Sequence, residues 1–206
     1  MRIEPSSHYS WWVRPLLWLQ KRHYGEVLNP ARLWGRKPVL FYLVAGFFGF
    51  LDRKSSPLSA ELRSLVCVRV SQLNDCAFCV DANGLKLAQR CGCEEKALAL
   101  SQWSESDLFN TQEKAVFTYL EAMTITGRKV TAEMITQLQT FLDEDTLIEL
   151  TALIAFQNLS AKFNTALDVP AQGLCHLPLP TSSVQEGAAE LNNRKSTDTR
   201  NDTSVH

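Results

Sequence analysis

The chain has 206 residues, of which 45% are hydrophobic and 21% are charged, and its formal net charge is −1. This length suits one main hydrophobic core rather than two, and the composition is ordinary for a soluble globular protein. Because positive charge is not in excess, we do not expect the chain to bind nucleic acid.

Two features bear on where the protein works. Its six cysteines, together with a first segment that does not resemble a signal peptide, fit a reducing compartment, so we expect a cytoplasmic protein. The apolar run 39–51, VLFYLVAGFFGFL, is shorter than the roughly 20 apolar residues needed to cross a bilayer. We therefore expect a buried helix there and no membrane span.

Two helices are expected next, one on each side of Asn74 and Asp75. Ser56 followed by Pro57 has the pattern of a helix cap and a first-turn proline, and leucines follow at helical spacing. Either Asn74 or Asp75 is expected to cap the second helix, 76–90, which begins with the first residue of a CxxC motif.

The rest of the chain also has helical patterns. Asn110 and Glu113 are spaced as in a capping box, residues 131–141 are amphipathic, and residues 143–145 supply the acidic first turn of a long last helix. Strand-like alternation is not seen, so we predict an all-α fold with a single helical-bundle domain. Residues 177–206 are rich in Pro, Ser, Thr, Asn and charge, which predicts a disordered C-terminal tail.

Cys76 and Cys79 form the CxxC motif, at a place where a helix is expected to begin. The partial positive charge at a helix start lowers the pKa of a thiol, so such a pair can cycle between dithiol and disulfide. A zinc site would also need Cys91 and Cys93, but along a continuous helix Cys79 and Cys91 lie about 18 Å apart. A redox pair is favoured, while a zinc site with a helix break at Gly84, or two inert core thiols, stay open as alternatives.

The segment 62–92, LRSLVCVRVSQLNDCAFCVDANGLKLAQRCG, resembles the signature of the carboxymuconolactone decarboxylase and alkyl hydroperoxidase D-like superfamily. The helical pattern from there to Pro170 is similar to that of the same family. The resemblance implies a domain over 37–170, leader helices within 1–36 that pack on it, and assembly into trimers or hexamers with the CxxC near the subunit surface. It implies neither a cofactor nor a metal.

The family's hydroperoxidase branch implies a role for each cysteine. Its second cysteine, here Cys79, attacks the peroxide, and its first, here Cys76, resolves the sulfenic acid to a disulfide. A small-molecule peroxide or disulfide is the implied substrate, and a thiol–disulfide reductant protein must restore the dithiol. The alternative is a non-catalytic helical oligomer, a binding or assembly protein with a vestigial CxxC.

The chain departs from the family's proton relay at two positions. Asn83 replaces the relay histidine, four residues after the second cysteine, and Ser64 replaces the relay glutamate, twelve residues before the first. Neither side chain takes up a proton near neutral pH, so the usual general base is missing. The possible supporting residues are Asn83, Ser64, Asp81 and Glu61. Asp81 and Glu61 are each expected to be a solvent-facing charge, and His23 is remote in sequence.

Overall fold

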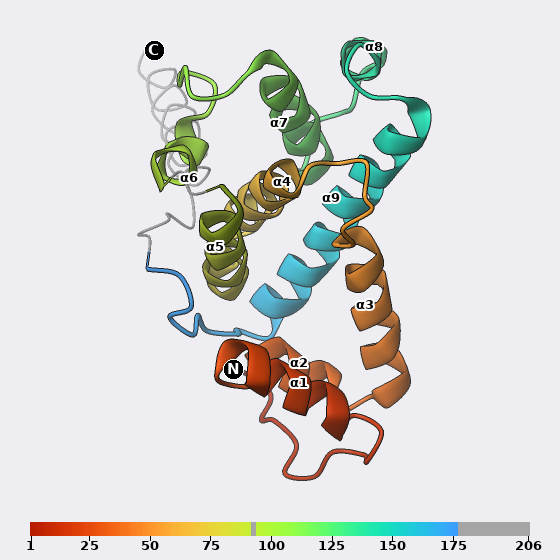
Figure 1. Cartoon of the computed structure of the whole chain (residues 1–206), viewed down its shortest axis with the longest axis vertical. Coiled ribbons are helices and arrows are strands. Elements are labelled where there is room, and N and C mark those ends of the chain that lie inside the picture. The colour runs from red at the N-terminus through yellow and green to blue at the C-terminus, as the bar shows by residue number, and fades with distance from the viewer. Residues whose placement is uncertain (92–93, 177–206) are drawn as a thin grey trace, which may run out of the picture.

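The computed structural model describes residues 1–91 and 94–176, and within these ranges the chain is helical with no strand, as predicted. The predicted disordered tail, 177–206, lies outside the described residues. Figure 1 shows the helices, which are α1 (Arg14–Tyr24), α2 (Asn29–Trp34), α3 (Pro38–Leu51), α4 (Ala60–Leu73), α5 (Ala77–Cys91), α6 (Glu94–Ala99), the 3-10 turn η1 (Leu100–Gln102), α7 (Thr111–Thr124), α8 (Ala132–Gln139) and α9 (Glu144–Ala166).

Helix α4 is the centre of the bundle. It packs against α5, α7 and α9 (Figure 1), and every residue from Leu62 to Gln72 is buried. Its first turn begins later than predicted, because the Ser59 hydroxyl accepts the Leu62 N–H at 3.1 Å and caps the helix. Ser56 lies before the helix and its hydroxyl donates to Glu149 instead.

The starts of α7 and α9 agree with the sequence patterns. The Asn110 side chain accepts the N–H of Glu113, and the Glu113 carboxylate accepts the N–H of Asn110, each at 2.9 Å, which completes the capping box at α7. Asp143 accepts the N–H of Thr146 at 2.7 Å and caps α9. Both signals lie within four residues of the helix that they start, and both predictions are confirmed.

Helix α3 forms where the apolar run predicted it, but the expectation that it is buried was wrong. Phe41 and Leu51 are its buried residues, whereas Val39 is 76% exposed and Leu43 is 65% exposed. The helix lies along the outside of α9 (Figure 1), so one of its faces is not covered by any described part of the chain. Across the described part of the chain, no helix combines the length and apolarity needed to cross a membrane.

The N-terminal segment is attached to the end of α9. The indole of Trp34, at the end of α2, stacks on the ring of Phe163 with centroids 3.6 Å apart. The N–H of Arg2 donates to the carbonyl of Leu167 at 2.8 Å. These contacts place α1 and α2 over the start of α5, while the division into leader helices and a domain stays a prediction.

A buried ion pair joins α4 to α7. Glu121 Oε1 accepts from Arg69 Nη2 at 2.7 Å and from Trp103 Nε1 at 2.8 Å, and Arg128 binds its other oxygen at 2.9 Å. Burial would raise the pKa of Glu121, but the hydrogen bonds from Trp103 and Arg69 outweigh burial and hold that pKa below its ordinary value.

We expect Glu121→Gln to lower the free energy of unfolding at neutral pH by about 3 kcal/mol, because it leaves the buried Arg69 without its counter-charge. The folded-state pKa of Glu121 is lowered, so its stabilisation is complete above the unfolded-state pKa, near ~4.3, and is lost as the pH falls through the folded-state value. The difference in the free energy of unfolding between wild type and variant, measured by urea unfolding, should therefore become smaller in acid. The exposed Glu105→Gln is the control, and a pH-independent deficit would contradict this account.

Candidate redox site

The two cysteines are joined in a disulfide at the start of α5. Their Cα atoms lie 5.2 Å apart, within the usual range for a disulfide. The sulfur of Cys76 takes the capping position of the helix and accepts the N–H of Cys79 at 3.2 Å. The expected cap at Asn74 or Asp75 was wrong, because Asn74 ends α4 and Asp75 adopts a left-handed conformation with φ of 51°.

The pair is more deeply buried than the resemblance implied. Cys76 is 2% exposed and Cys79 is 3% exposed, so neither sulfur lies at the surface of the chain. Of the two, Cys79 lines a pocket of about 480 Å³, a volume typical of small-molecule sites. Access to the pair is therefore through this pocket, from the side of Cys79.

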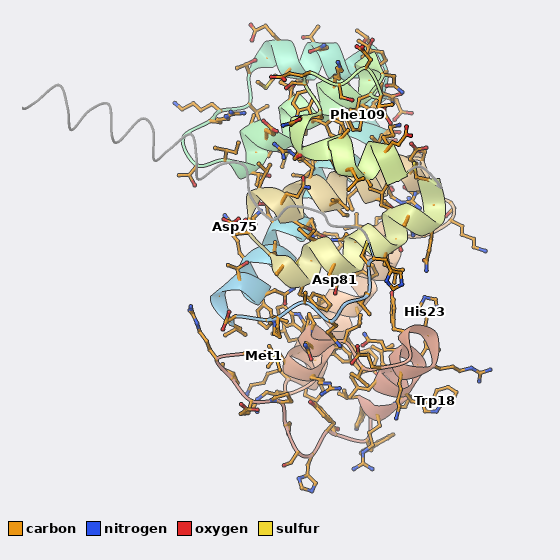
Figure 2. All side chains as sticks on the ribbon, turned by 90° about the vertical axis from the view of Figure 1, so that its left-hand side faces the viewer. Met1, Trp18, His23, Asp75, Asp81 and Phe109 are labelled. Carbon is orange, nitrogen blue, oxygen red and sulfur yellow. A yellow bond between two sulfur atoms is a disulfide. The ribbon has the colours of Figure 1, made fainter. Side chains whose placement is uncertain are left out.

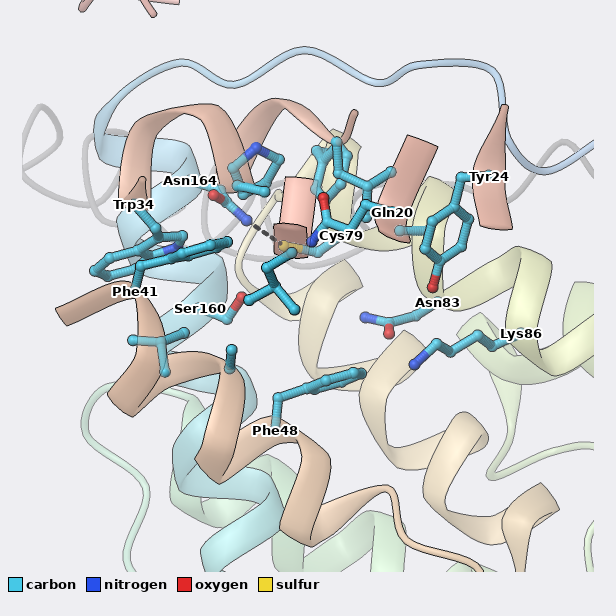
Figure 3. A pocket seen from close by; sticks show the side chains of 18 of the residues that line it. Gln20, Tyr24, Trp34, Phe41, Phe48, Cys79, Asn83, Lys86, Ser160 and Asn164 are labelled. Atoms are coloured by element: carbon cyan, nitrogen blue, oxygen red, sulfur yellow. Dashed lines mark hydrogen bonds between the residues drawn. The ribbon is translucent and has the colours of Figure 1, made fainter. Parts of the chain in front are cut away.

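The pocket is formed by residues distant in sequence. Its walls come from α1, α2, α3, α5 and α9, so the N-terminal helices close the site above the cysteines (Figure 3). Apolar side chains make up most of the lining, and six of them are aromatic: Tyr24, Trp34, Phe41, Phe48, Phe78 and Phe156. Such a lining favours an apolar ligand or substrate.

Helix α9 contributes a polar stripe of Gln157, Ser160 and Asn164 to the pocket. The amide nitrogen of Asn164 donates to the sulfur of Cys79 at 3.2 Å (Figure 3), and that of Gln157 donates to the Ser71 hydroxyl at 3.0 Å. None of these three residues was predicted from the sequence. Their spacing of i, i+3 and i+7 puts them on one face of a largely apolar helix, and that pattern was a usable signal.

The two positions that replace the family's relay residues lie in different places. Asn83 lines the pocket, and its amide nitrogen donates to Ser71 at 3.2 Å. Ser64 accepts from Arg90 Nη1 at 3.1 Å, and Arg90 is eleven residues after Cys79, or about 16 Å along α5. The structure thus brings Asn83 to the pocket with Cys79 but places Ser64 near the other end of α5.

Asp81 is not a solvent-facing acid, so that prediction was wrong. It is 8% exposed, and its carboxylate accepts the backbone N–H of Gln172 at 2.8 Å and that of Cys175 at 2.7 Å. Figure 2 shows it on α5 where the C-terminal segment passes. The side chain of Gln172 in turn accepts the N–H of Asn29 at 2.6 Å. Asp81 therefore holds the C-terminal segment, and through it the start of α2, against α5.

Glu61 is engaged away from the CxxC pair. Its carboxylate forms an ion pair with Lys96 Nζ at 2.7 Å, and Lys96 also binds Glu113 at 2.6 Å. Glu61 thus links α4 to α6, and the structure does not bring it to the pocket that Cys79 lines.

A cation lies on the pocket wall one turn beyond Asn83. Lys86 Nζ binds Asp52 at 3.0 Å and sits 4.0 Å from the ring centroid of Phe48. Burial lowers the pKa of Lys86, although Asp52 opposes that shift. Burial would raise the pKa of Asp52, but Lys86 and Arg90 together hold it below its ordinary value. His23 of α1 lines the same pocket, despite its distance in sequence.

The remaining cysteines that the structure describes do not add a metal centre. Helix α5 runs without a break from Ala77 to Cys91, through Gly84, so Cys79 and Cys91 stay about 18 Å apart. Among the described residues, no group of three or more His, Cys, Asp or Glu side chains is placed to hold a metal ion. Cys67 is a buried core thiol, and burial raises its pKa to about 12.

Comparison with known proteins shows the family to which the chain belongs. Residues 38–122 match the model of the carboxymuconolactone decarboxylase family. The chain is 48% identical to YnjA, an uncharacterized protein of Escherichia coli, over 178 residues, which are 86% of this chain and 98% of YnjA. The chain belongs to the carboxymuconolactone decarboxylase family. YdfG, an uncharacterized protein of Bacillus subtilis, is 30% identical over 102 residues, 49% of this chain and 69% of YdfG.

Solved structures show the same fold at low sequence identity. The alkylhydroperoxidase AhpD core of an uncharacterized peroxidase-related protein from Ralstonia eutropha has a TM-score of 0.73 at 19% identity, over 84% of this chain and 93% of that one. The debrominase Bmp8 has a TM-score of 0.70 at 20% identity, over 79% of this chain and 87% of Bmp8. The predicted alkyl hydroperoxidase D-like fold is confirmed.

Proposed function

We propose that the protein is a thiol-dependent oxidoreductase that reduces a small-molecule peroxide or disulfide through Cys79 and Cys76. The observation that carries this proposal is the different setting of the two sulfurs. Cys79 lines the apolar pocket, whereas Cys76 lies behind it within disulfide reach. This division fits an attacking and a resolving cysteine.

The reaction with a peroxide follows from that division. The Cys79 thiolate attacks one peroxide oxygen, so that an S–O bond forms while the O–O bond breaks, and the leaving alkoxide takes a proton and departs as an alcohol. The Cys76 thiol then attacks the sulfenic sulfur, the disulfide forms and water leaves. Cys79 and Cys76 are oxidised together and the peroxide is reduced, so a dithiol donor, which we expect to be a reductant protein, must restore them.

Thiol titration of the reduced protein tests this function. Added peroxide should remove two thiols per chain, because the sulfenic acid on Cys79 is captured by Cys76. Cys79→Ser should abolish the loss, and Cys76→Ser should leave a sulfenic acid on Cys79 that a dimedone label detects. Cys67→Ser, which removes a buried thiol outside the pocket, should behave as wild type. Thiols that resist both peroxide and a small disulfide would favour the non-catalytic alternative.

The missing proton relay predicts a gain of function. Asn83→His places a base one helical turn from Cys79 on the pocket wall, so peroxide reduction should accelerate by about tenfold or more. Ser64→Glu should add nothing, because residue 64 faces Arg90 rather than the cysteines. Stopped-flow rates of the single and double variants measure both effects. A faster Ser64→Glu protein, or an Asn83→His protein no faster than wild type, would contradict this assignment.

We also propose that the protein is a homo-oligomer, with a trimer or a hexamer as the expected state. The uncovered apolar face of α3 supports this, since a contiguous apolar patch of this kind is typical of an interaction surface.

Leu43→Glu, which puts a charge in the middle of that face, should reduce the mass measured by sedimentation. The exposed Leu108→Glu, in the loop before α7, is the matched control and should leave the mass unchanged. A wild-type mass of one chain, 23.2 kDa, would contradict the assembly.

A further inference from the structure

We propose that Asn164 lowers the pKa of the Cys79 thiol by donating a hydrogen bond to the thiolate, and so acts as a positioning and activating residue in place of a base. This inference rests on the proposed function of the cysteine pair. The donor and acceptor atoms, Asn164 Nδ2 and Cys79 Sγ, lie 3.2 Å apart (Figure 3). They come from α9 and α5, 85 residues apart in the chain.

The surroundings of Asn164 do not explain it as a stabilising residue. It is 1% exposed, and its amide oxygen has no hydrogen-bond partner among the described protein groups. A buried amide with an unpaired oxygen lowers stability, and an apolar side chain of similar size avoids that cost. Among the described residues, the hydrogen bond to the Cys79 sulfur is the one hydrogen bond that this side-chain amide makes.

The strength of this hydrogen bond depends on the redox state of the sulfur. A disulfide sulfur is a weak acceptor, whereas a thiolate carries a full charge and forms a charge-assisted hydrogen bond. The Asn164 amide therefore stabilises the reduced, ionised form of Cys79 more than the oxidised form. When Cys79 carries a sulfenic hydroxyl, the unpaired amide oxygen of Asn164 supplies an acceptor for it.

In the described part of the chain, the ionisable groups around the pocket do not hydrogen-bond to Cys79 Sγ, whereas Asn164 does. Lys86 and His23 line the pocket, but the Lys86 ammonium is paired with Asp52. Asp81 is bound to the backbone of the C-terminal segment, and Asp75 is exposed. Apart from Tyr24, the residues that α1, α2, α3 and α9 otherwise contribute to the described pocket lining are not ionisable.

The test is the pH dependence of Cys79 alkylation by iodoacetamide in the reduced protein, read on the peptide that contains Cys79 by mass spectrometry. Asn164→Leu should move the midpoint up by about one pH unit or more, the size expected for a lost hydrogen bond to a charged group. Asn164→Asp should move it up further, because a carboxylate beside the thiolate opposes its ionisation. The Asp variant also serves if the Leu variant does not fold.

Thr151→Val is the matched control on the same helix. The Thr151 hydroxyl bonds with Tyr119 of α7 at 2.8 Å and lies outside the pocket, so its loss should lower thermal stability without moving the midpoint of Cys79. Midpoints that stay unchanged in the Asn164 variants, or that move equally in Thr151→Val, overturn the proposal. Peroxide-dependent thiol loss in wild type is measured separately, so failure of the oxidoreductase function and failure of the role of Asn164 are distinguishable.

Discussion

The short connection between α4 and α5 controls the geometry of the cysteine pair. Three residues, Asn74, Asp75 and Cys76, reverse the chain between two closely packed helices. The Asn74 amide donates to Val70 of α4 at 2.8 Å and to Asn158 of α9 at 2.9 Å, and Asp75 takes the left-handed conformation that an aspartate tolerates. Asn74 and Asp75 belong to this turn, so the Cys76 sulfur caps α5. Cys79 then lies on the side of α5 that lines the pocket.

The N-terminal helices change the environment in which that cysteine reacts. By covering the start of α5, α1 to α3 place it beside a partly enclosed pocket, where Cys79 is 3% exposed. Hydrogen bonds and the helix-start charge act more strongly on a thiolate when water does not screen them. The pocket beside Cys79 includes six aromatic side chains, a setting that suits the small-molecule substrate of the proposed function.

Local signals in the sequence were enough for the starts of α7 and α9 and for the CxxC, whereas α6 was not predicted and tertiary contacts decided much of the rest. The capping box at Asn110 acts over three residues, so the sequence alone predicted it. The position of Asp81 depends on a segment more than ninety residues downstream, and the donor to Cys79 comes from α9. Neither contact leaves a pattern near the motif. The exposure of α3 was missed for a similar reason. An apolar sequence indicates that a helix face avoids water, but it does not indicate whether the same chain or another one covers that face.

A hydrogen-bond donor and a general base activate a thiol in different ways. A base removes the proton as the attack occurs, whereas a donor increases the fraction of thiolate before the substrate arrives. Lowering the pKa of Cys79 also lowers the intrinsic nucleophilicity of its thiolate and makes it a better leaving group. Because the pair is reached from the side of Cys79, an incoming thiol attacks that sulfur and Cys76 is the thiolate released, so in the proposed cycle the Asn164 hydrogen bond acts on Cys79 as the nucleophile. An amide donor without a relay histidine therefore increases the thiolate fraction of Cys79 at the expense of the nucleophilicity of each thiolate.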